Sequence, residues 1–358
     1  MDIVKALRRR DYIRLTASTA VALGLISQPP AALSHHSPNV HFDRTETVEF
    51  TGELTQITWR NPHVLMSVRT TNDNGEHVVW NLEYLAPSFL SRQGISKELF
   101  TTGDIVRVAG FRGRTNPTAL FATNILAADG REIFDFQFVE SRFTEDIVGV
   151  TYREYQEARK RALPESADGI FRVWTTDVSV IGPDRTLWKD TYPLTEQARA
   201  AHASWDRVAD NPYIRCENGM PAIMDQFYAM EFVAEGEDIL LHLEELDMVR
   251  TIYMTDGPRD PSPSVLGYSV GRWDGESLVV TTTRINWPWF DQTGVGQTEA
   301  IELVERFTPS EDGLRLNYSV TATDPATFTE PVVLTRDWIW LPGEMIQPYD
   351  CTVNEDSY

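Results

Sequence analysis

Three of the seven histidines lie within seven residues, at His35, His36 and His41. Imidazole and amine nitrogens suit Cu(II), Ni(II) or Zn(II), and Cu(II) is favoured by the order of metal affinities. If an export leader is removed directly before His35, its α-amino group and imidazole can bind one metal ion together, and His36, His41 or His63 can supply a third nitrogen. Because a free terminus is usually mobile, the alternative is a segment without function. Copper is therefore a candidate cofactor, and both interpretations stay open.

The residues before this cluster have the order of an export signal: a basic block, an apolar run from Leu15 to Ile26, and small residues. The run is too short to cross a bilayer core of about 30 Å. Arg9–Arg14, with the sequence RRDYIR, resembles a twin-arginine signal, and an ordinary secretory signal is the alternative. We expect residues 1–34 to be removed after Ser34 and the mature chain to be periplasmic or secreted.

The charge of the chain argues against two classes of partner. Its formal net charge is −21, and the leader carries five basic residues against two acidic ones, so the rest of the chain is near −24. Such a chain repels nucleic-acid phosphates and anionic lipid surfaces, and no basic patch offsets the repulsion. We expect no nucleic-acid partner and no stable membrane span after cleavage of the signal.

The two cysteines, Cys216 and Cys351, are candidates for a disulfide. An oxidising compartment permits the bond, and it would close a loop of 135 residues, which restricts the unfolded chain. A bridge needs two Cα atoms within about 7 Å, which the sequence cannot show. The alternative is two buried free thiols.

Residues 35–133 are predicted to form one small β domain. Short segments with alternating apolar residues are separated by turn signals such as NDNG, as in antiparallel strands. A short helix begins at Pro87 and stops at Gly94. Three strands, a helix and two strands is the element order of the OB-fold, a five-stranded barrel. Basic and aromatic residues do not interleave on a strand face, so we do not expect this domain to bind oligonucleotides.

A helical connector is expected over residues 134–165, and a second β domain over residues 166–358. The domain opens with a strand and a helix whose N-cap is Thr195, and eight β segments follow from Gln226 onward. Their number and spacing predict an up-and-down antiparallel barrel, similar to a lipocalin, which can hold one small ligand. The expected fold is mainly β, with an N-terminal OB-like five-stranded barrel and a C-terminal lipocalin-like antiparallel barrel.

Several motifs of the chain are specific. They include HHSPNVHFD, TGELTQITWRNPH and GDIVRVAGFRGR in the first half, and NPYIRCENGMPAIM and PYDCTVNED toward the end. Together they resemble an exported bacterial family that is filed as a domain of unknown function, over most of residues 35–358. The resemblance implies an exported chain that begins near His-His-Ser, but no activity or cofactor. Many relatives have an arginine between Pro221 and Met224, where this chain has Ala222 and Ile223.

An aromatic cluster in the second domain is a candidate binding site. The segment INWPWFD joins two predicted strands and places Trp287 and Trp289 where they could cover one end of the barrel. A concave, largely apolar cavity with a few polar groups is the usual form of a small-molecule site. The alternative is that the tryptophans are ordinary core. The candidate ligand-binding residues are Tyr253, Tyr268, Trp273, Trp287, Trp289 and Arg250.

A histidine and two acidic residues are candidates for catalysis. His242 and Glu244 share one face of a predicted strand, opposite Leu241 and Leu243. If that face is inward, they form an acid–base pair with Arg250 as an anion holder; the alternation of apolar residues favours the outward orientation. The catalytic candidates are His242, Glu244 and Asp291.

These patterns support three functional hypotheses. The preferred one is an exported periplasmic protein that binds a small, largely apolar molecule in the C-terminal barrel. The second is a cofactor-independent lyase or isomerase that acts in the same cavity. The third is a copper-binding protein that uses the mature N-terminal His35. The sequence leaves open whether the protein is an enzyme.

Overall fold

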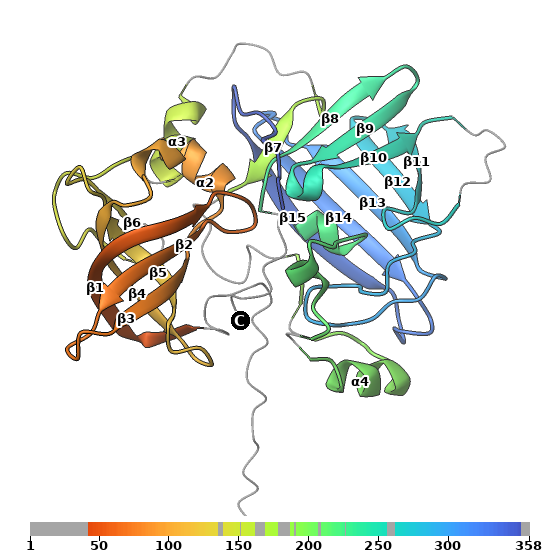
Figure 1. Ribbon diagram of the computed structural model, residues 1–358. Coiled ribbons are helices and arrows are strands. Elements are labelled where there is room, and N and C mark those ends of the chain that lie inside the picture. The colour runs from red at the N-terminus through yellow and green to blue at the C-terminus, as the bar shows by residue number, and fades with distance from the viewer. Residues whose placement is uncertain are drawn as a thin grey trace, which may run out of the picture. The chain divides into compact units, whose positions relative to one another are not determined.

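Two β modules hold most of the residues that the structure, a computed structural model, describes (Figure 1). The N-terminal module is a six-stranded sheet and the C-terminal module is a closed barrel of nine strands, so the mainly β fold is confirmed. Among the described residues, no helix has the length and hydropathy to cross a bilayer. The described residues are 42–134, 139–150, 152–161, 169–177, 187–189, 191–206, 209–225, 227–255 and 262–351.

The N-terminal module closes as an OB-like barrel should. Its strands are β1 (Phe42–Thr58), β2 (Leu65–Thr71), β3 (His77–Glu83), β4 (Ile105–Gly113), β5 (Ala119–Leu126) and β6 (Glu132–Phe134). Antiparallel pairs join β3 to β2, β2 to β1, β1 to β4 and β4 to β5, and a parallel pair joins β3 to β5. The first five strands thus form a ring around a buried apolar core. The short β6 extends the sheet beside β5 and was not expected.

Short helices complete this module. The helix α2 (Pro87–Arg92) begins with proline at its first position and is followed by Gly94, whose φ of +80° suits glycine. A single turn, η1 (Lys97–Leu99), leads into β4. The expected connector helix is α3 (Tyr152–Lys160).

All eight β segments predicted after Gln226 form strands of the C-terminal barrel. The opening strand β7 joins them as the ninth, and β10 and β11 pair in parallel rather than antiparallel. The strands are β7 (Val173–Thr176), β8 (Met230–Glu235), β9 (Asp238–Leu243), β10 (Met248–Tyr253), β11 (Tyr268–Asp274), β12 (Ser277–Thr283), β13 (Glu302–Pro309), β14 (Arg315–Thr323) and β15 (Val332–Trp340).

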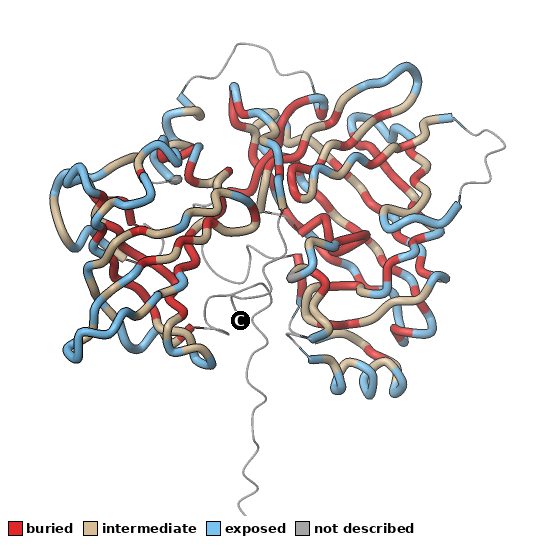
Figure 2. Tube along the Cα trace, viewed as in Figure 1, coloured by how far each residue is buried: buried red, intermediate tan, exposed pale blue. Residues whose placement is uncertain are grey.

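Alternation along the strands decides which side chains fill the barrel. On β14, Leu316, Tyr318 and Val320 are buried, whereas the neighbouring Arg315 and Asn317 are exposed. Figure 2 shows the same change between buried and exposed residues along other strands of the barrel. Successive side chains of a strand point to opposite faces, so the buried set lines the interior.

The barrel has two different ends. Short turns join β11 to β12 and β13 to β14 at one end, where β7 also begins; we call this the turn end. Longer connections over 284–301 and 324–331 join β12 to β13 and β14 to β15 at the other end, the loop end. The two ends therefore present different surfaces to a ligand.

Several short helices precede β8 or follow β9: α4 (Glu196–Ala203), η3 (Pro212–Arg215), η4 (Ala222–Asp225) and η5 (Glu245–Asp247). The hydroxyl of Thr195 accepts a hydrogen bond from Ala198 N, which confirms the predicted N-cap of α4. The helix ends at Ala203. Ser204 Oγ donates to Ala201 O at 2.7 Å, a local bond that competes with a further helical turn.

Candidate ligand-binding site

Five polar side chains from five successive strands meet inside the barrel; we call them the central cluster. Nη1 of Arg250 donates to Glu305 Oε1 at 3.0 Å, and its Nη2 also contacts Glu305. Nε of Arg250 donates to Ser269 Oγ at 2.9 Å, and Nη2 donates to Thr282 Oγ1 at 2.6 Å. The hydroxyl of Tyr318 donates to Glu305 Oε1 at 3.0 Å. Alternation brings these residues inward from β10, β11, β12, β13 and β14.

The central cluster is fully paired. Arg250 is 2% exposed and Glu305 is 0% exposed, and each oxygen of that carboxylate accepts at least two hydrogen bonds. Burial raises the pKa of Tyr318 well above its usual value, and the charge of Glu305 adds to the rise. A buried ion pair that is satisfied in this way fixes the arrangement of the strands around it. We therefore interpret the cluster as part of the scaffold.

A second buried ion pair connects the barrel wall to η4. Arg336 on β15 contacts Asp225, and its Nη2 donates to Thr176 Oγ1 at 2.7 Å. Every residue of η4 is buried, and Met224 Sδ lies 4.0 Å from Nη1 of Arg250. Gln297, in the loop after β12, donates to Met220 O at 2.8 Å. The η4 turn therefore enters the barrel from the loop end.

The INWPWFD segment lies at the loop end, where it contributes to the core. Trp287 and Phe290 are buried, and Trp289 packs partly exposed against Trp205 at 6.3 Å between ring centroids. The carboxylate of Asp291 is buried and accepts from Thr293 N at 2.8 Å and from Val295 N at 3.1 Å. Burial raises the pKa of Asp291, partly offset by the hydrogen bonds from Thr293 and Val295. This carboxylate holds its own loop together.

A cavity of about 400 Å³ opens at the turn end. Its walls are the start of the second module at 169–172, the turn between β11 and β12, and the turn between β13 and β14. Phe171 and Trp273 are exposed there, at 37% and 45%, and their ring centroids lie 6.1 Å apart. Large aromatic side chains usually avoid water, so this exposed pair beside a cavity marks a candidate binding surface.

The N-terminal module has a cavity of its own, of about 740 Å³. It lies between the end of β1 and η1, with Trp59 and Phe100 at 6.5 Å between ring centroids. Phe100 is buried in the core of the module, and Arg60 is paired with Asp350 at 3.4 Å. This cavity therefore offers fewer exposed aromatic groups than the turn end of the barrel.

The predicted ligand-binding residues lie in three places. Trp273 lines the cavity at the turn end. Tyr253 and Tyr268, at 5.2 Å between ring centroids, are partly exposed side by side on the parallel strands β10 and β11. Trp287 and Trp289 lie at the loop end, and Arg250 belongs to the central cluster. The structure thus separates the residues that the sequence grouped.

The three predicted catalytic residues do not converge. His242 is partly exposed on the outer face of β9, between the buried Leu241 and Leu243. Glu244 is 0% exposed and accepts from Arg92 of α2 through both oxygens, at 2.9 and 2.6 Å. Burial raises the pKa of Glu244, and the hydrogen bonds and charge of Arg92 oppose that rise. His242, Glu244 and Asp291 therefore lie in three separate environments and not in one cavity.

Arg92 connects the two modules. Besides its contacts with Glu244, Nε donates to Glu344 Oε1 at 2.9 Å. The other oxygen of Glu344 accepts from the hydroxyl of Tyr155 at 2.7 Å. Both acids and the guanidinium are almost fully buried. The cluster therefore couples α2 to the barrel and to the segment after β15.

The histidine cluster of the predicted metal site, His35, His36 and His41, lies outside the described residues. His63, the fourth candidate ligand, lies near the backbone of Tyr84 at 2.9 Å and near Glu83 at 3.4 Å. Within the described residues, no group of three or more His, Cys, Asp or Glu side chains could hold a metal ion. Copper binding stays a prediction, which metal analysis of purified mature protein would test.

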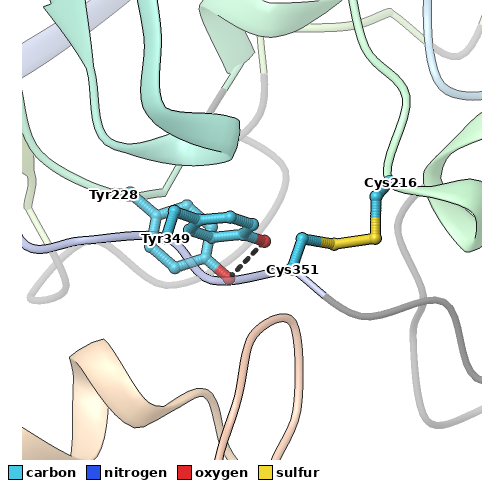
Figure 3. Close-up of a disulfide and its surroundings, with 4 residues drawn as sticks. All are labelled: Cys216, Tyr228, Tyr349 and Cys351. Carbon is cyan, nitrogen blue, oxygen red and sulfur yellow. Dashed lines mark hydrogen bonds between the residues drawn. A yellow bond between two sulfur atoms is a disulfide. The ribbon is translucent and has the colours of Figure 1, made fainter.

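The predicted disulfide is confirmed. Cys216 and Cys351 are bonded, with their Cα atoms 6.1 Å apart (Figure 3). Beside the bond, the hydroxyl of Tyr349 lies 3.4 Å from that of Tyr228. The segment that ends at Cys351 also reaches the N-terminal module, where Asn61 N donates to Asp350 O at 2.9 Å. A disulfide suggests an oxidising compartment.

A family model matches the N-terminal part of the chain. Residues 22–121 match DUF6152, a family of unknown function. The DUF6152 match runs from upstream of β1 into β5 and includes α2 with Arg92 and the residues that line the N-terminal cavity. The expected resemblance to a family of unknown function is thereby confirmed. No curated protein matches the chain.

Several residues that are prominent in the structure are not among the candidates that the sequence predicts. Glu305 stands at an inward position of β13, between Leu303 and Phe307. A charged residue among inward-facing apolar positions indicates a buried polar interaction, so the sequence does contain a signal for Glu305. Arg336 gives the same signal on β15. Phe171 gives none, because the sequence does not show which aromatic side chains stay exposed.

Proposed function

We propose that the protein binds a small, largely apolar molecule at the turn end of its C-terminal barrel. The observation that carries this proposal is the cavity of about 400 Å³ beside the exposed rings of Trp273 and Phe171. Small-molecule sites are usually concave, about 300–1,000 Å³ in volume, and lined by apolar and aromatic groups with a few polar ones. The turn-end cavity has that size, and the rings of Phe171 and Trp273 give it an apolar surface beside several charged residues.

The rest of the barrel supports this position. Its described interior carries the fully paired central cluster together with large apolar side chains such as Trp174 and Phe232. The loop end carries η4 and the buried part of the INWPWFD segment. The turn end is where aromatic groups of the barrel remain exposed beside a cavity.

The arrangement favours binding over catalysis. A general acid or base must come within hydrogen-bonding reach of a reacting group. His242 is on the outer face of β9, Glu244 is paired with Arg92, and Asp291 is bonded to its own loop. A lyase or isomerase that uses these three residues in one cavity would need them together.

The proposed setting is the periplasm. The export-signal pattern of residues 1–34 and the disulfide between Cys216 and Cys351 support it. In this setting the protein would hold its ligand outside the cytoplasm, after removal of the leader.

The neutral fluorophore N-phenyl-1-naphthylamine tests the proposal. It fluoresces strongly only in apolar surroundings, so a titration of the mature protein measures binding directly. We expect saturable binding that Trp273→Ala weakens at least tenfold. The matched control is Val333→Ala, which removes an exposed apolar side chain from the outer face of β15.

Two outcomes would overturn the proposal. One is an absence of saturable binding by the folded wild-type protein. The other is binding that is lost in Trp59→Ala but unchanged in Trp273→Ala, which would move the site to the cavity of the N-terminal module. Circular dichroism of each variant shows whether its fold is retained.

A further inference from the structure

We infer that the ligand of the turn-end cavity carries a cationic group, such as an ammonium, at one end of its apolar body. This inference rests on the proposed function and adds the chemical class of the ligand. It follows from the charges on the two turns that carry the cavity walls, together with the exposed aromatic pair between them.

Three carboxylates line the cavity: Glu276 in the turn between β11 and β12, and Glu311 and Asp312 in the turn between β13 and β14. The carboxylate of Asp312 is engaged, because it accepts from Ser310 Oγ at 2.6 Å and from Leu314 N at 3.0 Å. Glu276 and Glu311 are exposed and have no hydrogen-bond or ion-pair partner in the part of the chain that the structure describes. Both are therefore available to a ligand.

Arg172, the basic residue in the lining of the cavity, already has interaction partners in the protein. Arg172 donates from Nη1 to Gly313 O at 3.0 Å, and its guanidinium lies 4.4 Å from the ring centre of Trp340 and 5.3 Å from that of Trp174. Its side chain is buried beneath the cavity. With three carboxylates and one guanidinium, the lining has an excess of two negative charges. Charge complementarity with the lining therefore selects a cation.

The aromatic pair points to the same chemistry. A cation is attracted to the face of a tryptophan or phenylalanine ring when it lies within about 6 Å of the ring centre. The exposed rings of Trp273 and Phe171 lie at the same cavity as the two unpaired glutamates. An apolar body can rest on these rings while its charged end meets the carboxylates. The net charge of −21 also draws cations toward the protein.

A charge series with one constant body tests the inference. The probes are 3-phenylpropylammonium, 3-phenylpropanol and 3-phenylpropanoate, each used to displace N-phenyl-1-naphthylamine from the mature protein at low salt. We expect the cation to bind about tenfold more tightly than the alcohol, and the anion to bind most weakly. The preference for the cation should decrease with added salt, because exposed charges are screened.

Two double variants separate the local charges from the charge of the whole chain. Glu276→Gln/Glu311→Gln removes the two unpaired carboxylates of the cavity. Glu302→Gln/Glu330→Gln removes two exposed carboxylates at the loop end. We expect the first to abolish the preference for the cation and the second to retain it. Binding of N-phenyl-1-naphthylamine itself should persist in both.

The results distinguish this inference from the proposed function. Equal affinity for all three probes overturns the cationic ligand and leaves apolar binding intact. A preference that both double variants reduce equally also overturns it, because the field of the whole chain would then be responsible. If N-phenyl-1-naphthylamine does not bind the wild-type protein, the proposed function fails, and the inference fails with it.

Discussion

The buried carboxyl group of Glu245, in η5, should make the stability of the protein depend on pH. Its side chain is 7% exposed, and its Oε1 accepts a hydrogen bond from Asn218 Nδ2 at 2.9 Å. Burial raises the pKa of Glu245 from 4.5 to about 7; the hydrogen bond from Asn218 lowers it, and the charge of Asp225 raises it further. Glu245→Gln keeps an acceptor for Asn218 but cannot ionise.

The size and sign of the change in stability with pH follow from the raised pKa of Glu245. In the unfolded chain the carboxyl group ionises near pH 4.5, whereas in the folded protein it keeps its proton until about pH 7. Between these values the unfolded state binds fewer protons, so stability falls as the pH rises. The contribution of the protonated Glu245 to the free energy of unfolding is complete below pH 4.5 and is lost as the pH rises through 7. One pKa unit corresponds to 1.36 kcal/mol, so the loss is about 3 kcal/mol.

Urea unfolding at pH 5, 6, 7 and 8 measures this contribution. Because Glu245→Gln lacks the pH-dependent loss, it should gain about 2–3 kcal/mol relative to the wild type between pH 5 and pH 8. Glu330→Gln, an exposed carboxyl group, is the control and should show no such change. A difference between Glu245→Gln and the wild type that stays constant across these pH values would refute the reasoning.

Three further predictions concern stability. Arg250→Met should destabilise the protein by about 3–5 kcal/mol because it leaves Glu305 buried without its partner, and Arg250→Met/Glu305→Leu should recover much of that loss. If urea unfolding shows the same loss of unfolding free energy for the single and the double variant, this prediction is wrong. Arg92→Met should separate the calorimetric transition into two, one for each module, and a single unshifted transition would disprove the coupling. Cys216→Ser/Cys351→Ser should lose about 5 kcal/mol in the chain-entropy model, and dithiothreitol should bring the wild type to the same stability but leave the variant unchanged.

The sequence predicts most of the fold because burial alternates regularly along the strands. Leu316, Tyr318 and Val320 show the alternation on β14, and the same period marks most of the eight segments after Gln226. On β12 it is interrupted, because the residues from Ser277 to Val280 are all buried. The closure of the ring through β7, and the parallel pairing of β10 with β11, leave no such periodic signal. They depend on which strand edges meet in space.

The candidate site was less predictable because its partners lie far apart in sequence. The sequence places Arg250 near His242 and Glu244, its neighbours along the chain, whereas in the structure it pairs with Glu305, 55 residues away. Alternation shows that Arg250 and Glu305 both point inward, yet it does not show that they face each other. The cavity at the turn end depends on two turns and a segment more than 100 residues upstream, so Trp273 is the one predicted ligand-binding residue in its lining.

The contacts of Arg92 have a consequence for the order in which the chain is made. Glu244 lies 152 residues after this arginine, and Glu344 lies 252 residues after it. At a synthesis rate of about 5–20 residues per second, the second acid is made roughly 13–50 s after α2. During that interval the N-terminal module can form its own core but cannot bury Arg92 against these acids. The complete contact of Arg92 with both acids therefore has to wait until the segment after β15, which carries Glu344, has been made.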